Sequence, residues 1–124
     1  MMRTRLLDIA HAGILAPSAD NRHVFRIEIK ETSLCLWPTN EFAATTERHS
    51  RILSLISLGA VVENMRLRAG ELDLSSHATW SAAGSSAGSI VQVDLLDAPT
   101  DDSDGLMAAI PDRHTNRRCT AALV

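Results

Sequence analysis

Aromatic residues are scarce in this sequence, and positive charge is not in excess. Phe and Trp together make up 3% of the chain, and tyrosine is absent. Few side chains are therefore available to stack on exposed bases. The formal net charge of -3 also gives no general attraction for nucleic acids or anionic membranes. We therefore expect no nucleic-acid partner.

Cysteine is rare as well, which argues against a disulfide framework and a zinc site. The two cysteines, Cys35 and Cys119, are far apart and form no CxxC pair. The five histidines are scattered, without a pair at the spacing of metal ligands on a helix. Cys35 lies among alternating apolar residues, where a small buried side chain is expected. These features predict a reduced, cytoplasmic protein with no metal site.

No hydrophobic run is long enough for a membrane span. A transmembrane helix needs about 20 predominantly apolar residues, and the apolar stretch near the N-terminus is interrupted by Asp8 and His11. The pattern of a signal peptide is absent too. The length of 124 residues and the hydrophobic content of 45% suit one globular domain with its own core. We expect a single domain over residues 1–124 and no membrane partner.

Hydrophobic periodicity predicts a helix and a β-hairpin in the first third of the chain. Apolar residues recur every three to four positions over residues 3–16, as in an amphipathic helix, and Pro17 ends it. Residues 24–30 alternate between apolar and charged side chains and predict a half-buried strand. A short turn leads to a second strand over residues 34–37, which is expected to pair with the first.

The most regular helical segment covers residues 51–74. Because it is apolar on most sides, it is either central to a core or buried against another subunit. Gly59 lies inside it at a cost of about 1 kcal/mol relative to Ala, which close approach of another backbone would offset. Strands are expected over residues 77–80 and 90–96, so the elements give an α+β layer arrangement. One stripe of the helix is expected to contain Leu53, Ile56, Ala60, Met65, Ala69 and Leu72.

The segment after the first helix carries the most informative polar residues. Pro17, Ser18 and Asn21 belong to a tight turn that presents hydroxyl, amide and backbone N–H groups. Such a turn either binds a planar, hydrogen-bonding ligand or simply connects a helix to a strand. The residues alone leave both interpretations open.

Two stretches resemble the flavin-dependent nitroreductase family. Ala-Pro-Ser-Ala-x-Asn at residues 16–21, followed by Phe25-Arg26, resembles the family's flavin-contacting turn. Ser-x-Gly-Ala-x-x-Glu-Asn at residues 57–64 resembles its long central helix, which packs across a two-fold axis. The resemblance implies a nitroreductase-like fold with a long central helix and antiparallel hairpins. It also implies that Pro17, Ser18 and Asn21 contact FMN.

A basic stretch near the C-terminus contains Arg113, Arg117 and Arg118. Guanidinium groups pair well with phosphate oxygens, so the stretch is either a phosphate site or a solvated tail. In the nitroreductase family a motif of the type Arg-x-Thr/Ser-x-Arg grips the FMN phosphate, normally ahead of the first helix. Its place here resembles relatives with two nitroreductase-like halves in one polypeptide. Residues 111–124 are then the start of a second half or a basic tail, and the chain is a truncated version of the fold.

Two functions follow from the resemblance. The first is an FMN-dependent oxidoreductase, or a component of one, that reduces a nitroaromatic or quinone-like acceptor with a nicotinamide donor. The second is a non-catalytic dimeric interaction domain that kept the fold but lost the flavin. His23-Val24, where the family usually has Gln-Pro, favours the second, as does the lack of a counterpart to the family's later flavin-pocket segments. Both functions imply a homodimer through residues 51–74, and no catalytic residue is predicted.

Overall fold

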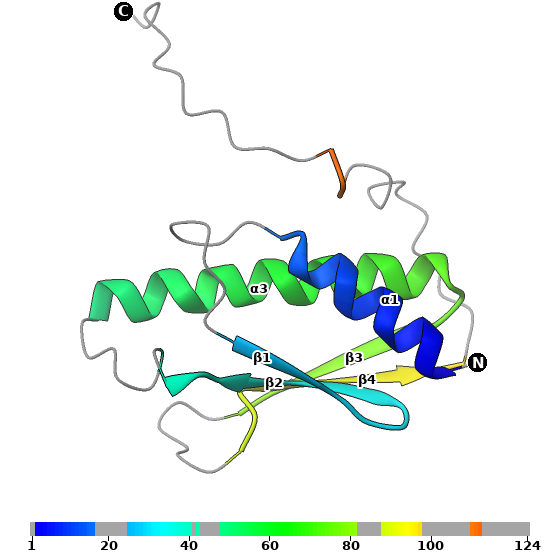
Figure 1. The fold of residues 1–124 in the computed structure, drawn as a ribbon, viewed down its shortest axis with the longest axis horizontal. Helices are drawn as coiled ribbons and strands as arrows, with labels where there is room; N and C mark the ends of the chain where they lie inside the picture. The colour runs from blue at the N-terminus through cyan, green and yellow to red at the C-terminus, as the bar shows by residue number, and fades with distance from the viewer. Residues whose placement is uncertain are drawn as a thin grey trace, which may run out of the picture.

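The structure is a computed structural model that describes residues 2–16, 25–40, 42, 48–81, 88–97 and 110–112. Its elements follow in the order α1 (Met2–Ile14), β1 (Phe25–Ile29), β2 (Ser33–Pro38), α3 (Arg48–Glu71), β3 (Ser75–Trp80) and β4 (Val91–Leu96). α1 and α3 lie on the same side of the four-stranded sheet (Figure 1). This is the α+β layer arrangement that the sequence predicts.

The sheet is built from the two predicted hairpins. Its order is β1-β2-β4-β3, and every pairing is antiparallel. Ile27 lies opposite Leu36 in the first hairpin, and Ala78 lies opposite Val93 in the second. The hairpins join where Leu34 of β2 pairs with Val93 of β4. β1 and β3 therefore form the two edges of the sheet.

Side-chain alternation places one core between the sheet and the helices. In β4, Val91, Val93 and Leu95 are buried, whereas Gln92 and Asp94 between them are only partly buried, as expected because successive side chains point to opposite faces. α1 packs on β1 and β2, while α3 packs on β3 and on α1. The largest fully buried members of the core are Leu6, Ile9, Leu34, Leu36, Leu58, Met65, Leu74, Val91 and Val93.

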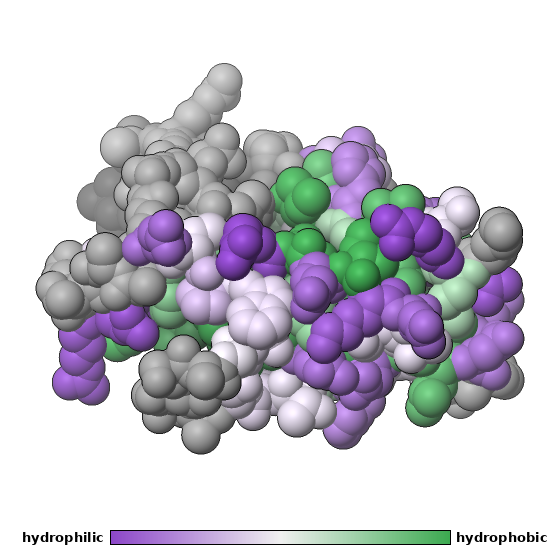
Figure 2. Space-filling view, turned by 60° about the horizontal axis from the view of Figure 1, so that its bottom comes forward, coloured by the Kyte–Doolittle hydropathy of each residue, from purple (hydrophilic) through white to green (hydrophobic). Residues whose placement is uncertain are grey.

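The other face of the sheet is largely polar. Figure 2 turns this side toward the viewer and shows hydrophilic residues around a smaller hydrophobic area. Cys35 alternates with the core residues Leu34 and Leu36, yet it is only 1% exposed, and its thiol lies 3.7 Å from Gln92 Oε1. The predicted burial of Cys35 is confirmed, and it is a free thiol.

The predicted long helix is present, but both of its ends shift. α3 begins at Arg48 instead of residue 51 and ends at Glu71 instead of residue 74. Asp73 adopts a left-handed conformation with φ of 60°, which Asp tolerates better than most residues. Leu74 N then donates to Ala69 O at 2.9 Å, and Asp73 N donates to Gly70 O at 3.1 Å. These two bonds form a Schellman motif that ends the helix and turns the chain into β3.

The buried stripe of α3 differs from the predicted one. Its buried residues are Leu58, Val61, Met65 and Ala69. Met65 and Ala69 were predicted correctly, but Leu53 and Ile56 were not, since they are 38% and 65% exposed. The hydrophobic periodicity does not indicate which side of α3 faces the core, because apolar residues occur on most sides of this helix.

The remaining boundaries differ from the prediction by one or two residues. β3 begins at Ser75 instead of residue 77, because Ser75 still pairs with Leu96. α1 is helical to Ile14, after which Leu15 and Ala16 continue in a tighter turn. Such differences are ordinary at the ends of elements.

Candidate functional site

The predicted site residues all fall in segments that the structure leaves undescribed. These residues are Pro17, Ser18, Asn21, Arg113, Arg117 and Arg118, which lie outside the described residues. Their roles therefore remain predictions. The structure does describe both flanks of the predicted flavin turn, namely the end of α1 through Ala16 and the start of β1 at Phe25. These flanks define where the turn leaves and rejoins the fold.

α3 holds the end of α1 through a side-chain hydrogen bond. Asn64 Nδ2 donates to the backbone oxygen of Ala12 at 3.0 Å. The same oxygen accepts Leu15 N at 3.2 Å, as the last turn of α1 tightens. A carbonyl oxygen has two lone pairs, so Asn64 supplies a second donor to an oxygen in the last turn of α1. Asn64 is the final residue of the motif at residues 57–64.

Packing brings the same two helix segments close together. A β-carbon at Gly13 would lie 2.9 Å from Met65 Cε and 3.1 Å from Val61 Cγ1. Gly13 is buried, and so are both α3 residues that face it. In the middle of α1, Asp8 accepts a hydrogen bond from Arg68 Nη2 in an ion pair between the helices. α1 is thus fixed to α3 at two separate places.

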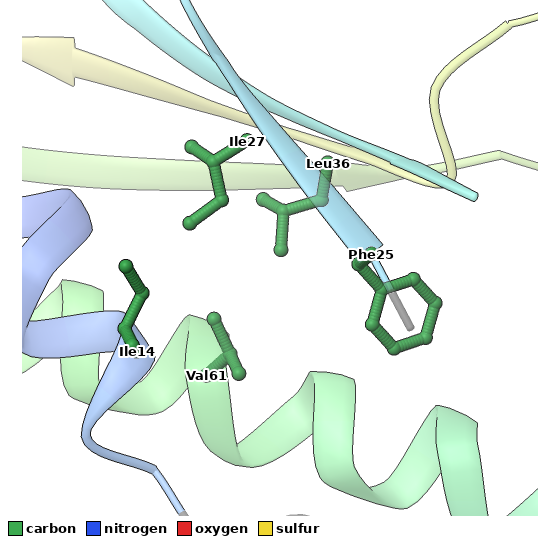
Figure 3. A pocket seen from close by; sticks show the side chains of 5 residues that line it. All are labelled: Ile14, Phe25, Ile27, Leu36 and Val61. Carbon is green, nitrogen blue, oxygen red and sulfur yellow. The ribbon is translucent and has the colours of Figure 1, made fainter. Parts of the chain in front are cut away.

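A small apolar cavity lies beside the flanks of the predicted turn. It is lined by Ile14, Phe25, Ile27, Leu36 and Val61, and its volume is about 40 Å³. Figure 3 shows the strand side chains extending toward the helices, with Ile14 and Val61 opposite them. This volume holds a few water molecules, whereas small-molecule pockets usually measure about 300–1,000 Å³. The cavity cannot enclose a flavin; its apolar wall includes Ile14 and Phe25, which lie on the two flanks of the turn.

An aromatic cluster ties the start of β1 to the start of α3. The rings of Phe25 and Phe42 are 5.3 Å apart, with an interplanar angle of 48°. The Arg51 guanidinium lies 4.6 Å from the centre of the Phe42 ring, and Arg51 Nη1 donates to Phe42 O at 3.3 Å. Sequence reasoning missed Phe42 and Arg51, because no spacing rule links a connecting-segment aromatic to a cation on the following helix.

The first half of α3 exposes a second apolar stripe. Ile52, Leu55 and Ile56 are 44%, 42% and 65% exposed, and a β-carbon at Gly59 would meet nothing within 4 Å. Residues 52, 55, 56 and 59 follow helical i, i+3, i+4, i+7 spacing, so they share one face. We call these four residues the exposed stripe; it lies on a different side of α3 from the buried stripe. A contiguous exposed apolar patch is typical of an interaction surface.

Two groups with shifted pKa values belong to ion pairs away from the cavity. The pKa of Glu63 is lowered, mainly because Arg66 donates a hydrogen bond to its carboxylate. The pKa of Arg68 is raised, mainly by its hydrogen bond to Asp8. Neither pair contributes to the cavity wall. Both are interpreted as structural pairs.

The described part of the chain contains neither a cluster of metal-ligand side chains nor a membrane-spanning helix. Within these residues, no three His, Cys, Asp or Glu side chains come together as a group that could hold a metal ion. None of the helices described here is both long enough and apolar enough to cross a membrane.

Comparison with known proteins bears on the fold. No protein-family profile and no curated protein sequence matches the chain. Its structure is similar to the crystal structure of a nitroreductase family protein from Clostridium novyi NT, with a TM-score of 0.59. The sequences are 14% identical, and the match covers 82% of this chain and 75% of that chain. The chain therefore has a nitroreductase-like fold, as the two motifs predict.

Proposed function

We propose that the chain is an FMN-dependent oxidoreductase, or a component of one, which reduces a nitroaromatic or quinone-like acceptor with a nicotinamide donor. The nitroreductase-like fold carries this proposal. It is supported by the sequence resemblance at residues 16–21, which follow α1 in the sequence, and at residues 57–64, which lie within α3.

The proposed flavin contacts come from two segments of the chain. Ser18 and Asn21, with Pro17, would contact the flavin on the turn after α1, and Arg113, Arg117 and Arg118 would bind its phosphate. When bound, FMN supplies the hydride chemistry, while the protein binds and orients it. The apolar wall formed by Ile14, Phe25 and Val61 would exclude water from one side of the turn. No described residue is assigned the role of acid or base.

The proposed partner is a second copy of the chain, bound through α3. Two observations support this partner. The exposed stripe leaves apolar side chains in contact with solvent. At Gly59 a β-carbon would meet no atom within 4 Å, so nothing in this chain explains the cost of a glycine inside the helix. Close approach of the partner's α3 at Gly59 would account for both. A flavin too large for the cavity of one chain would then lie between two chains.

A non-catalytic dimeric interaction domain is the second candidate function. The small cavity favours it, because its lining side chains are all apolar and offer no hydrogen-bond donor to a flavin ring. The exposed stripe is compatible with either function. Flavin binding therefore separates the two candidates, whereas dimerisation does not.

The test is to mix the purified chain with FMN, remove free FMN by gel filtration and record the visible spectrum of the protein. Retained flavin that is reduced by a nicotinamide supports the oxidoreductase. A colourless dimer that ignores FMN supports the interaction domain. The paired substitution Arg117→Ala and Arg118→Ala is expected to weaken FMN binding, and an unchanged affinity removes both arginines from the site.

A further inference from the structure

We infer that the open edge of β3 is an interaction surface, which pairs antiparallel with β3 of a second copy of the chain. This pairing adds a strand contact to the homodimer proposed through α3, and it rests on that homodimer but not on flavin binding. β3 covers Ser75–Trp80 and forms one edge of the sheet. Within the described residues, β4 is its one neighbour in the sheet.

The backbone of β3 leaves a regular row of hydrogen-bonding groups on the open edge. Ser81 N donates to Ile90 O at 2.8 Å, which continues the ladder between β3 and β4 by one pair. In an antiparallel ladder, alternate residues direct their N–H and C=O groups toward the same neighbour. His77 and Thr79 therefore face β4, as Ser81 does. The backbone groups of the remaining residues point away from the sheet, namely those of Ser76, Ala78 and Trp80.

The side chains of β3 lack the features that protect a sheet edge. Exposed edge strands usually carry charged residues, proline or a bulge, which prevent pairing with another chain. β1, the other edge of the sheet, carries Arg26 and Glu28, and both are exposed. β3 has the sequence Ser-Ser-His-Ala-Thr-Trp, which contains no Asp, Glu, Lys, Arg or Pro, and its register with β4 has no bulge. This contrast indicates that another strand covers β3 but not β1.

Exposed apolar side chains lie on the same flank of the fold as the β3 edge. Trp80 is 48% exposed, and it lies opposite Val91 on the face of the sheet that the helices cover. α1 contacts Asn64 of α3 and packs on β1 and β2, whereas α3 packs on β3. Gly59 precedes Asn64 on α3, and the two lie about 140° apart around the helix axis at 3.6 residues per turn. The exposed stripe therefore faces away from α1, toward the β3 side, where one partner copy can cover the stripe and the edge together.

The chain itself is a complementary partner for this edge. A two-fold axis at Ala78 places Ser76 opposite Trp80 of the partner subunit, and Ala78 opposite its own equivalent. Every outward-facing N–H and C=O group of the two strands then has a partner. On the other face of the sheet, His77 lies opposite Thr79 of the partner subunit, so no like charges meet across the pair.

Disulfide trapping tests both the pairing and its register. His77→Cys and Thr79→Cys are purified separately as full chains, each with Cys119→Ser, and are then mixed with oxidised glutathione. In the inferred register, positions 77 and 79 form a non-hydrogen-bonded pair with α-carbons about 4.5 Å apart, which suits a disulfide. Same-site positions are diagonal neighbours about 7–8 Å apart. Peptide mapping should therefore find the disulfide between 77 and 79 at about tenfold the amount of either same-site disulfide.

Arg26→Cys and Glu28→Cys are the matched control pair. They have the same spacing and lie on the same outer face of the sheet, but on the other edge strand. Their mixture should show no comparable excess of the mixed-site disulfide. An equal excess at β1 would assign the trapping to collisions between exposed thiols and overturn the inference.

Ala78→Pro tests the backbone contact without an added thiol. Because the Ala78 N–H faces the open edge, proline removes a donor to the partner strand and leaves the ladder with β4 intact. We expect the dimer dissociation constant to rise about tenfold or more, since the symmetry removes two hydrogen bonds. Sedimentation measures this constant, and thermal unfolding reports whether the variant folds. An unchanged constant in a folded variant contradicts the inference, and disulfide trapping decides if the variant does not fold.

The outcomes separate this inference from the proposed function. A wild-type chain that stays monomeric overturns the pairing together with the proposed homodimer. A dimer without the excess of the disulfide between 77 and 79 means that something else covers β3. That result overturns the inference alone and leaves the α3 interface standing. Neither result affects the proposal of FMN binding, which is tested by the visible spectrum of the protein.

Discussion

Gly13 of α1 and Met65 of α3 are in such close contact that a β-carbon on the glycine would come within 2.9 Å of Met65 Cε. Met65 is completely buried, so its side chain has little room to move away. Asn64, the preceding residue on α3, hydrogen-bonds to the residue before Gly13. The contact between α1 and α3 at this point thus depends on the absence of a side chain at Gly13 and on the side-chain amide of Asn64.

The Gly13 contact predicts that Gly13→Ala destabilises the fold. Overpacking costs about 1–3 kcal/mol, which exceeds the gain of up to about 1 kcal/mol when Ala replaces Gly in a helix. We expect the free energy of unfolding to fall by about 1 kcal/mol in denaturant titrations. An increase in stability would show that the buried side chains around Gly13 adjust at no cost.

Gly59 gives the opposite prediction, because a β-carbon there meets open space within the chain. Gly59→Ala should stabilise an isolated chain by up to about 1 kcal/mol through helix propensity. If the partner's α3 approaches at this point, the same substitution should shift the dimer toward monomer. Sedimentation at several protein concentrations measures this shift. If the variant dimerises as tightly as the wild type, the partner does not approach α3 at Gly59.

The exposed stripe predicts that Ile56→Glu abolishes dimerisation. Ile56 is 65% exposed in the single chain, so the charge should cost the monomer little but would be buried without a partner in a dimer. Leu96→Glu is the matched control, because Leu96 is 61% exposed at the end of β4 and is not part of the exposed stripe. We expect light scattering to report a monomer for the first variant and a dimer for the second. Dimers from both variants would rule out the exposed stripe as the interface.

The Glu63–Arg66 pair predicts a small pH-dependent effect on stability. The folded-state pKa of Glu63 is lowered by Arg66, so its contribution is present above the unfolded pKa of about 4.3 and is lost as the pH falls through the folded pKa. Because both side chains are substantially exposed, the contribution is only about 0.3–0.5 kcal/mol. Glu63→Gln should lower stability by this amount at neutral pH and converge with the wild type in acid. An equal difference at both pH values would assign the effect to another cause.

Local patterns in the sequence predicted most of the helices and strands. How these elements pack together depends on contacts between residues that are far apart in the sequence. Alternation between apolar and charged residues located β1, and the two hairpins follow from strands that are neighbours in the sequence. The side of α3 that faces the core could not be predicted, because Ile56 and Met65 are both apolar and only packing against the rest of the fold distinguishes them. The end of α3 was also missed, since it depends on the left-handed conformation of Asp73.

The candidate site was less accessible to sequence reasoning than the fold. The turn and the helix motif were identified by resemblance. The hydrogen bond from Asn64 to the end of α1 was not predicted, because its acceptor lies 52 positions away in the sequence. The cavity wall combines Ile14, Phe25, Leu36 and Val61, which come from different elements. No local spacing marks such a set. The proposed contacts at Ser18 and Asn21 remain predictions from the sequence.

The central claim is that the turn after α1 binds FMN, and an equilibrium titration of FMN into the purified chain tests it most directly. Flavin fluorescence should change with saturation, and Asn21→Ala should weaken the binding by about tenfold or more, since a buried partner group loses its hydrogen bond. Saturable binding that depends on Asn21 is the predicted result. A wild-type chain that leaves the fluorescence of FMN unchanged at every concentration contradicts the claim.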